Sequence, residues 1–425
     1  MATTIAWGRN MRALRSRNYR LFFAGQSVSL IGTWMTRLAT SWIVYQLTDS
    51  AFLLGLTSFV GQIPAFFVTP IAGVWLDRWN RHHVLVITQV LAMIQSLALA
   101  ALAFTGSINL WWVIGLTLCQ GLINAFDMPA RQAFVIEMIE ERGDLGNAIA
   151  LNSSMVNGAK LVGPAIAGVM IAGAGAGFCF LIDGLSYIAV IWSLLAMKVA
   201  PAAPYVVQKS AWQELTEGWK YVVESSAIRS ILLLLALVSV VGMPYTVLMP
   251  VVAVDILHGG AHTLGFLVGM SGVGALASAI GLALRKTVIG LGKRIAISAG
   301  LFGVGLVFLG ISKSLTISLL LMTITGFGMM QQMAASNTIL QTIAADDKRG
   351  RVMSFYTLAI LGMNPIGSLL AGAVAARIGV PATMIGAGTI CLAGALWFYW
   401  KLPEIRAVIR PIYRELGILP EVAEG

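Results

Sequence analysis

Long apolar stretches alternate with short polar breaks along the chain. Each stretch has about 20 residues or more, which is the length that a helix needs to cross roughly 30 Å of hydrocarbon. Twelve such stretches are expected to form membrane-spanning helices, at residues 19–46, 52–76, 83–104, 109–131, 147–171, 176–197, 227–254, 262–284, 289–311, 315–341, 351–377 and 380–400. The pattern predicts an all-α membrane protein with twelve transmembrane helices.

The longest internal polar break separates the sixth stretch from the seventh and divides the chain into two sets of six helices. We expect an N-terminal six-helix bundle at residues 1–197, a cytoplasmic linker at 198–226, a C-terminal six-helix bundle at 227–401 and a cytoplasmic tail at 402–425. The two halves match weakly at a constant offset, which brings Ala167-Gly168 over Ala371-Gly372. A parallel duplication of this kind predicts two pseudo-symmetric bundles with a substrate site between them.

A short amphipathic helix is expected within the linker. Ser210-Ala-Trp-Gln213 resembles a capping box, and apolar side chains repeat at helical spacing, at Trp212, Leu215, Trp219 and Val222. Such a helix is expected to lie on the cytoplasmic membrane surface. It is either a tether between two moving halves or a packed linker.

The composition agrees with membrane insertion, because 58% of the 425 residues are hydrophobic and only 11% are charged, against roughly 25% charged in soluble domains. The first stretch is too long for a signal peptide and is expected to remain in the mature protein. If the N-terminus is cytoplasmic, only Lys313 and Arg377 fall in breaks on the outer side. We therefore expect a multi-pass protein of the cell inner membrane with both termini in the cytoplasm. The net charge of +10 follows from this asymmetry, so nucleic acid is not an expected partner.

Metal, cofactor and catalytic motifs are not evident in the sequence. Asp255, His258 and His262 have metal-compatible spacing only within a helix, which Gly259-Gly260 would interrupt. Three cysteines fall singly in apolar stretches, at Cys119, Cys179 and Cys391. The phosphate-binding pattern Gly-x-x-x-x-Gly-Lys-Ser/Thr is missing, which argues against direct drive by ATP. We expect no cofactor, no metal and no enzymatic activity.

The break between the second and third stretches is rich in charge. Its residues resemble the Gly-x-x-x-Asp-Arg-x-Gly-Arg-Lys signature of the major facilitator superfamily, with Asn80 at the second glycine, and the matching positions are Gly73, Asp77, Arg78, Arg81 and His82. The resemblance implies a twelve-helix carrier. It also implies a latch between this loop, the fourth helix and the eleventh helix, which holds the cytoplasmic mouth shut.

Asp77 is the informative residue of this loop, because an acid adds nothing to the distribution of positive charge that sets topology. It can meet the positive end of a neighbouring helix, while Arg78 or Arg81 can meet another acid. Asp127, in the segment Asp127-Met-Pro-Ala-Arg131, is the expected partner, and Arg131 belongs to the same candidate latch. The alternative is that these charges only anchor the loop in the cytoplasm.

Two longer stretches resemble one branch of this superfamily. Asp127-Met-Pro-Ala-Arg-Gln-Ala-Phe134 and Arg349-Gly-Arg-Val-Met-Ser354 are similar to segments of enterobactin exporters and related secretion carriers. In the fifth helix, Gly163, Pro164 and Gly168 resemble the Gly-x-x-x-Gly-Pro-x-x-Gly-Gly motif of proton-coupled antiporters, with alanine at two glycine positions. This favours export over uptake, and generic helix packing by small residues is the alternative.

Two cations fall inside predicted spans, where a charge normally faces a cavity or a partner. Arg37 lies roughly 26 Å along the first helix from Arg20, and Lys160 lies roughly 20 Å into the fifth helix. Polar side chains at helical spacing continue both faces, namely Gln26, Ser29, Thr33, Thr40, Ser41, Ser153 and Asn157. The tenth and eleventh helices could supply the opposite wall with Ser336, Asn337, Gln341, Thr357, Asn364 and Ser368. The candidate substrate contacts are Arg37, Thr33, Ser41, Asn157, Lys160, Asn337 and Asn364.

The two cations favour an anionic or strongly hydrogen-bonding cargo, such as a catecholate siderophore or an acidic lipid. An internal salt bridge with Asp183 of the sixth helix is the alternative, and cargo could compete for that pair. Proton coupling needs a carboxylate whose affinity for protons changes between states. Asp183 is the candidate, because Asp127 is assigned to the latch.

The combined expectation is a secondary active transporter that works by alternating access and exports a small amphipathic or anionic molecule, siderophore or drug-like, against proton influx. Its expected partners are a small-molecule substrate, protons and membrane lipids, and we expect a monomer. A lysophospholipid flippase is the alternative within transport. A transport-inactive membrane receptor or scaffold is the alternative from another class.

Overall fold

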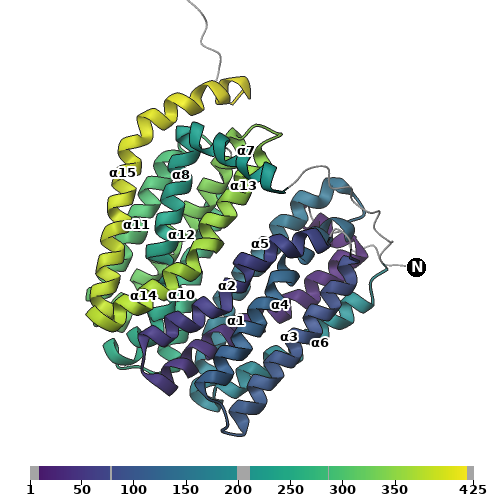
Figure 1. Cartoon of the computed structure of the whole chain (residues 1–425), viewed down its shortest axis with the longest axis vertical. Coiled ribbons are helices and arrows are strands. Elements are labelled where there is room, and N and C mark those ends of the chain that lie inside the picture. Colours follow the sequence, from purple (N-terminus) through teal and green to yellow (C-terminus); the bar gives the residue numbers. More distant parts are fainter. Residues whose placement is uncertain (1–8, 77–78, 199–210, 286, 419–425) are drawn as a thin grey trace, which may run out of the picture. The chain divides into compact units, whose positions relative to one another are not determined.

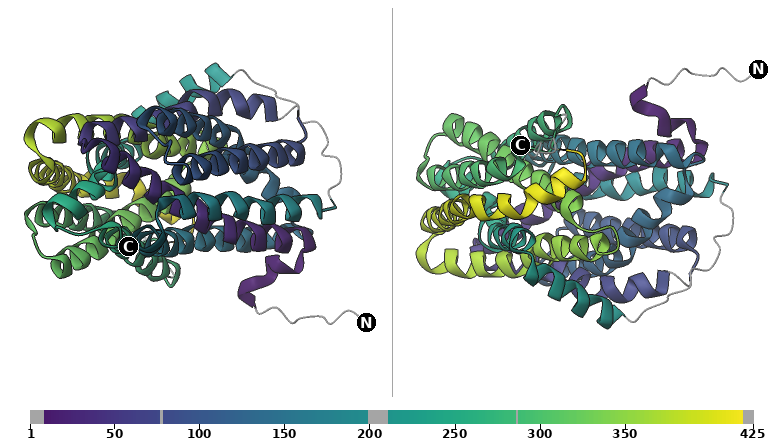
Figure 2. Two further views of the ribbon diagram at one scale, coloured as in Figure 1. Left: turned by 90° about the horizontal axis from the view of Figure 1, so that it is seen from below. Right: turned by 90° about the horizontal axis from the view of Figure 1, so that it is seen from above.

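The computed structural model describes residues 9–76, 79–198, 211–285 and 287–418, and every element within these ranges is a helix. Contacts divide the chain into two compact units. Unit 1 comprises Met1–Val206 and Met249–Gly272, and unit 2 comprises Val207–Leu248 and Val273–Gly425. Each unit is a bundle of helices, as Figure 1 and Figure 2 show.

Six long helices in the described part of unit 1 follow the first six apolar stretches. They are α1 (Arg17–Thr48), α2 (Ala51–Leu76), α3 (Arg81–Phe104), α4 (Leu110–Glu137), α5 (Leu145–Ala174) and α6 (Ala176–Leu195). Two short 3₁₀ turns, η1 (Arg9–Arg15) and η2 (Arg142–Asp144), precede α1 and α5. α1 packs along both α5 and α6, α3 packs on α4 and α6, and α2 packs on α4.

Unit 1 also contains a segment from later in the chain. α9 (Met249–Val251), the π-helical turn η5 (Val252–Ile256) and the first part of α10 (Ala261–Ala283) belong to it. The Tyr45 hydroxyl of α1 donates a 2.6 Å hydrogen bond to Asp255 Oδ2 in η5. The expected C-terminal bundle starts at residue 227, whereas the contacts group residues 249–272 with unit 1.

Glycines set how closely the helices of unit 1 approach. A Cβ built on Gly163 of α5 would lie 2.6 Å from Trp34 Cβ of α1. Further along α5, a Cβ built on Gly168 would lie 2.8 Å from Gly265 Cα of α10. Between membrane helices the attraction comes from close packing rather than from the removal of apolar surface from water, so small residues at these crossings hold the helices together.

Unit 2 contains the remaining helices of the described chain. They are α7 (Ala211–Glu224), α8 (Ser226–Leu237), the rest of α10, α11 (Leu291–Ile311), α12 (Leu315–Ile343), α13 (Arg349–Thr357), α14 (Met363–Ile378) and α15 (Val380–Glu415). The π turn η3 (Val238–Gly242) and the 3₁₀ turn η4 (Met243–Leu248) follow α8, and the π turn η6 (Leu358–Gly362) joins α13 to α14. The Ser239 hydroxyl in η3 donates a 2.7 Å hydrogen bond to the Ile360 carbonyl in η6. The two irregular turns are thereby joined to each other.

The linker forms a helix, α7, in the segment where one was expected. Its Trp219 ring lies 5.9 Å from the Phe355 ring of α13, centroid to centroid. The Ala345 amide, in the connection between α12 and α13, donates a 3.3 Å hydrogen bond to the Tyr221 hydroxyl. α7 is therefore fastened to other helices of unit 2, and the rest of the linker, residues 199–210, lies outside the described residues.

α15 continues past residue 400, where the last span was expected to end. In the extension Leu402, Ile405 and Ile409 are buried, while Arg406 and Arg410 are exposed. The first part of the expected tail is thus an amphipathic continuation of the helix, and residues 419–425 lie outside the described part of the chain.

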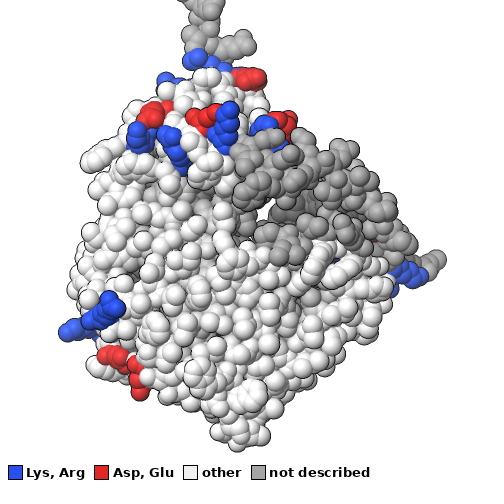
Figure 3. Space-filling model, viewed as in Figure 1, with Lys and Arg blue, Asp and Glu red and all other residues white. Residues whose placement is uncertain are grey.

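Eleven helices in the described part of the chain are long and apolar enough to cross a membrane. α1 is not among them, because its polar and basic side chains lower its average hydropathy. On the face drawn in Figure 3, charged side chains gather near the C-terminal end of α15, and broad areas of the surface are uncharged. The all-helical membrane architecture is confirmed, and a twelfth span formed by α1 stays a prediction.

Replacing Gly168 with alanine is expected to destabilise unit 1. The new methyl group would meet the backbones of Ala261 and Gly265, which cannot move aside as a flexible side chain can, and overpacking of this kind costs roughly 1–3 kcal/mol. The measurement is the midpoint of thermal unfolding of the purified protein in detergent. Gly173→Ala is the matched control on α5, since a Cβ there meets nothing within 4 Å. Equal midpoints for the two variants would contradict the close approach.

Candidate functional site

The two cations inside the helices of unit 1 meet over one aromatic ring. The Arg37 guanidinium of α1 lies 4.8 Å from the centroid of the Trp34 ring, and Lys160 Nζ of α5 lies 5.8 Å from the same centroid. Gly163, one turn beyond Lys160, leaves the space that brings the two helices together at Trp34. Arg37 is exposed and Lys160 is partly buried, so a ligand can reach both. Contacts of this type contribute roughly 0.5–2 kcal/mol each, the higher value applying where water is excluded.

Asp183 of α6 is buried, with 2% of its surface exposed, and it accepts hydrogen bonds from hydroxyl groups. Ser96 of α3 donates a 3.0 Å hydrogen bond to Oδ2, and Thr33 of α1 donates a 3.5 Å hydrogen bond to Oδ1. A Cβ on Gly32 would lie 2.8 Å from Asp183 Cα, so α1 approaches α6 closely at this point. Among the described residues Asp183 forms no ion pair, with Arg37 or with any other cation. The alternative of an Arg37–Asp183 salt bridge is not seen in this conformation.

The other polar candidates of unit 1 bond mainly within their own helices. The Ser41 hydroxyl donates to the Leu38 carbonyl at 2.9 Å, and Asn157 Nδ2 donates to the Ser153 carbonyl at 2.8 Å. Thr33 differs, since it faces Asp183 across the contact between α1 and α6. Within unit 1 the structure therefore brings together two groups of candidates, the Arg37–Lys160 pair on Trp34 and the Thr33–Asp183 pair.

Asp127 of α4, one of the latch candidates, is also buried, with 3% of its surface exposed. It forms an ion pair with Arg131 of the same helix. From α3, Thr88 Oγ1 and Gln89 Nε2 donate to Asp127 Oδ1 at 3.0 and 2.6 Å. The carboxylate therefore accepts from three donors. Two of these donors come from α3, so the carboxylate holds α3 against α4.

The loop after α2 is placed only in part. Gly73 lies in α2, whereas Asp77 and Arg78 lie outside the described residues. Arg81, at the start of α3, forms a 2.8 Å ion pair with Glu137 at the end of α4. His82 Nε2 is hydrogen-bonded to the Leu194 carbonyl of α6 at 2.8 Å. Glu137 is an acid of this region that the sequence analysis did not single out.

The candidates of unit 2 are separated from one another. Asn337 lines a cavity of about 400 Å³ at the end of α12, together with Thr338, Gln341, Thr342 and Arg349. Its side-chain oxygen accepts a 2.5 Å hydrogen bond from Gln341 Nε2. Asn364, at the start of α14, is partly buried and is not one of the residues that line this cavity.

The helix-packing residues of α5 face two different neighbours. Gly163 lies against Trp34 of α1, while Gly168 lies against α10, where a Cβ on Gly265 would come within 2.6 Å of the Pro164 carbonyl oxygen. No group of three or more His, Cys, Asp or Glu side chains that could hold a metal ion was found in the described ranges.

Two residues of these arrangements were missed in the sequence. Trp34 precedes Arg37 by one helical turn, a spacing that puts both on one face of α1 and could have been read as a cation–aromatic pair. Glu137 carried no comparable signal, because its partner Arg81 is far away in the sequence and only the packing of α3 on α4 brings them together.

Three comparisons with known proteins agree with one another. A family model described as transmembrane secretion effector matches residues 9–414. The staphyloferrin A transporter of Staphylococcus aureus is 25% identical over 89% of this chain and 95% of the relative. The multidrug efflux pump Tap of Mycolicibacterium fortuitum is 26% identical over 91% and 94%. The macrolide efflux protein A of Streptococcus pyogenes is 23% identical over 88% and 95%.

Solved structures share the fold. The chain resembles a bacterial homologue of the human lysosomal transporter Spinster, in an inward-facing and unoccupied conformation, with a TM-score of 0.68, 14% identity and coverage of 95% of this chain and 99% of that chain. It also resembles the nucleoside transporter NupG, with a TM-score of 0.70, 11% identity and coverage of 90% and 98%. At these identities the likeness shows the fold alone.

Proposed function

Because the chain belongs to the transmembrane secretion effector family of the major facilitator superfamily, we propose that it exports a small anionic or amphipathic molecule by alternating access, driven by proton influx. The observation that carries the cargo class is the pair of cations, Arg37 and Lys160, on the Trp34 ring. In this proposal α1 is the first of twelve membrane spans in two pseudo-symmetric bundles. The protein is a monomer of the inner membrane, with both termini in the cytoplasm.

The electrostatics of the Trp34 ring support an anionic cargo. Neither Arg37 nor Lys160 forms an ion pair within the described residues, so no carboxylate there competes with an incoming anion for either side chain. The aromatic face stabilises the two cations only partly, because its quadrupole is weaker than a full negative charge. A carboxylate or catecholate can therefore displace the ring as the partner of either cation. The relatives named for staphyloferrin A, macrolide and multidrug transport support a small molecule as the cargo.

Arg37→Gln and Lys160→Gln proteins are expected to lose transport of anionic cargo, each by about tenfold or more, since one charge-assisted contact contributes roughly 1.5–3 kcal/mol. The measurement is accumulation in proteoliposomes of an anionic siderophore, a macrolide and a cationic dye. Arg37→Lys keeps the charge and is expected to retain part of the activity.

The matched control is Lys313→Gln, which removes an equal charge from an exposed position between α11 and α12. Unchanged siderophore transport by both the Arg37→Gln and the Lys160→Gln protein would refute the cargo assignment. Lysophospholipid movement without a pH gradient would favour a flippase. If the wild-type protein moves none of these probes under any gradient, a receptor or scaffold becomes the better reading.

We propose Asp183 as the group that carries the coupling proton. A buried carboxylate with hydroxyl partners and no ion pair can hold a proton in one conformation and release it in another, once water or a cation reaches it. Arg37 lies on the same helix as Thr33, one turn away, and Thr33 contacts the acid. A shift of α1 along α6 would therefore change the charge that Asp183 experiences.

Asp183→Asn is expected to abolish the response of cargo accumulation to an imposed pH gradient, while cargo exchange down its own gradient persists. The amide oxygen can still accept from one of the two hydroxyls, Ser96 or Thr33, and the amide NH2 can donate to the other, so the fold is expected to survive. Ser96→Ala is the control, because it removes one hydrogen bond to the acid and leaves the titrating group in place. Concentration of cargo by Asp183→Asn at the wild-type rate would exclude Asp183 as the coupling residue.

We propose that the loop after α2 is one side of a cytoplasmic latch, with Asp77, Arg78 and Arg81 contributed by the loop and Asp127 and Arg131 by α4. The supporting geometry is that α3 and α4 are already held together by the Arg81–Glu137 ion pair and by the hydrogen bonds from Thr88 and Gln89 to Asp127. The loop between α2 and α3 can then move together with α3 and α4 when it closes against another part of the chain.

Asp77→Asn is expected to leave the protein inserted and folded but to lower transport by about tenfold, because the closed state loses a charge-assisted contact. Asp49→Asn is the matched control. Asp49 lies at the other end of α2, caps α1 with φ 45° and is exposed, and asparagine tolerates that left-handed conformation. Wild-type transport by Asp77→Asn would return the loop to a plain topological anchor.

A further inference from the structure

A basic segment at residues 9–20 precedes the membrane part of α1. It consists of η1 (Arg9–Arg15) and the first turn of α1, and it contains no acidic residue. Four arginines of the segment are exposed, namely Arg12, Arg15, Arg17 and Arg20. The residues between them are buried, including Ala13, Leu14, Ser16 and Tyr19.

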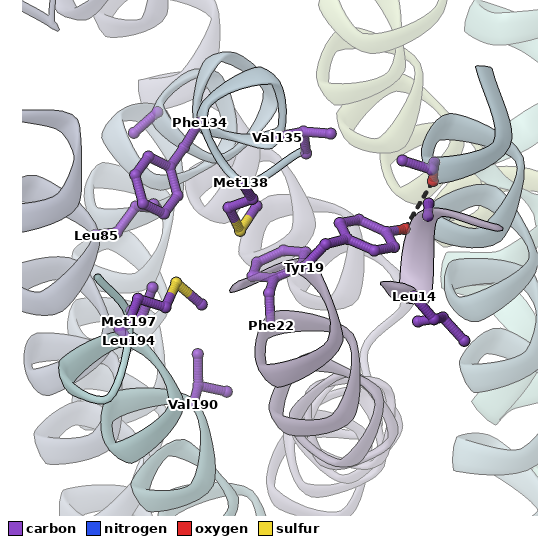
Figure 4. Close-up of a cluster of buried hydrophobic side chains, with 13 residues drawn as sticks. Leu14, Tyr19, Phe22, Leu85, Phe134, Val135, Met138, Val190, Leu194 and Met197 are labelled. Atoms are coloured by element: carbon purple, nitrogen blue, oxygen red, sulfur yellow. Dashed lines mark hydrogen bonds between the residues drawn. The ribbon is translucent and has the colours of Figure 1, made fainter. Parts of the chain in front are cut away.

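The buried face of the segment is fastened to the connection between α4 and α5. The Ala13 amide donates a 3.0 Å hydrogen bond to Asn147 Oδ1. The Ser16 hydroxyl accepts a 3.1 Å hydrogen bond from the Glu140 amide, across that connection. The Tyr19 hydroxyl donates a 2.8 Å hydrogen bond to the Ala148 carbonyl, which Figure 4 shows as a dashed line.

A hydrophobic cluster completes this attachment. Leu14, Tyr19 and Phe22 pack in one buried group with Phe134 and Met138 of the α4 end (Figure 4). A polar chain terminus bound only by charge could move freely over the membrane surface. Here the apolar side chains and three long-range hydrogen bonds hold the backbone in one place, so the positions of the arginines are fixed as well.

Three of the four exposed arginines have no ion-pair partner among the described residues. Arg12 lies 3.8 Å from Asp144, at the limit of an ion pair. Arg15, Arg17 and Arg20 form no ion pair with any described residue. Residues three apart lie on the same face of a 3₁₀ turn or of an α-helix, which aligns Arg12 with Arg15 and Arg17 with Arg20. The positive-inside rule needs cations on this side of the membrane, but it does not need them on a rigid, folded surface.

We propose that residues 9–20 form a binding surface for the phosphate groups of anionic phospholipids in the adjacent leaflet. The segment directly precedes a membrane helix, which puts its side chains at the depth of the headgroups. A guanidinium presents parallel N–H groups that match phosphate oxygens, and basic clusters next to membrane helices attract anionic lipids. The proposal concerns the membrane and is independent of the cargo.

The attachment gives bound lipid a route into the transport machinery. The connection that Ser16 and Ala13 hold joins α4, which carries Asp127, to α5, which carries Lys160. Lipid that immobilises the segment would also immobilise this connection. Transport by the wild-type protein is therefore expected to differ between membranes with and without anionic lipid.

The test is a titration of short-chain phosphatidylglycerol into the purified full-length protein, followed by thermal unfolding, with phosphatidylcholine as the neutral counterpart. The wild-type protein is expected to be stabilised by the anionic lipid and less by the neutral one. The combined variant Arg15→Gln, Arg17→Gln and Arg20→Gln is expected to bind phosphatidylglycerol about tenfold more weakly or worse. Its unfolding without lipid should match wild type, because the three side chains are exposed and unpaired.

Two further variants separate a site from general charge. Replacing Arg406, Arg410 and Arg414 on α15 by glutamine removes the same charge from another exposed basic helix, and lipid affinity should change little. Replacing the three N-terminal arginines by lysine keeps the charge and should restore only part of the affinity. Equal losses for the two glutamine variants, or equal stabilisation by both lipids, would overturn the proposal. Equal stabilisation by inorganic phosphate would also overturn it, since the surface would then bind free anions.

Discussion

The close approach of α1 to α5 and α6 determines where the charges of unit 1 can act. Gly163 lets the backbone of α5 come against Trp34, and Gly32 lets the backbone of α1 come against Asp183. In lipid, helices gain little by hiding apolar surface from one another, so such contacts depend on shape. A larger residue at position 163 would separate Lys160 from the ring that it shares with Arg37. A larger residue at position 32 would separate Thr33 from Asp183. The polar chemistry of the unit therefore rests on positions that have no side chain at all.

The charged side chains within the helices of unit 1 have two contrasting kinds of partner. Asp127 accepts from Arg131, Thr88 and Gln89, an arrangement that holds α3 against α4. Separating the members of a buried pair leaves an uncompensated charge, which is strongly destabilising. The side chains of such a cluster therefore stay together. Asp183, Arg37 and Lys160 have hydroxyl or aromatic partners instead. These weaker partners can be exchanged for cargo, water or protons, and this difference separates a structural cluster from a candidate transport site.

The helices were predictable from the sequence, and their partners were only partly so. The apolar stretches place α2 to α6 within a few residues, because a membrane helix is specified locally by length and hydropathy. The polar face of α1 is also local, since it depends on helical spacing. Asp127 was expected to meet an arginine of the loop after α2, whereas it pairs with Arg131 of its own helix. Arg81 with Glu137 and Tyr45 with Asp255 were not predictable, because the residues are distant in sequence and meet only after the helices pack. The grouping of residues 249–272 with unit 1 has the same cause.

Because residues 249–272 belong to unit 1, the boundary between the two units does not coincide with the linker in the sequence. A cut within the linker would give an N-terminal fragment that lacks Met249–Gly272, although these residues belong to unit 1. In such a fragment Pro164 and Gly168 of α5 would lose their contact with α10, and Tyr45 would lose its acceptor Asp255. The first half would be incomplete as a folding unit until the second half is made. During synthesis the bundle that begins with α1 would therefore be completed only when the first part of α10 is made, which makes the folding of unit 1 depend on residues beyond the linker.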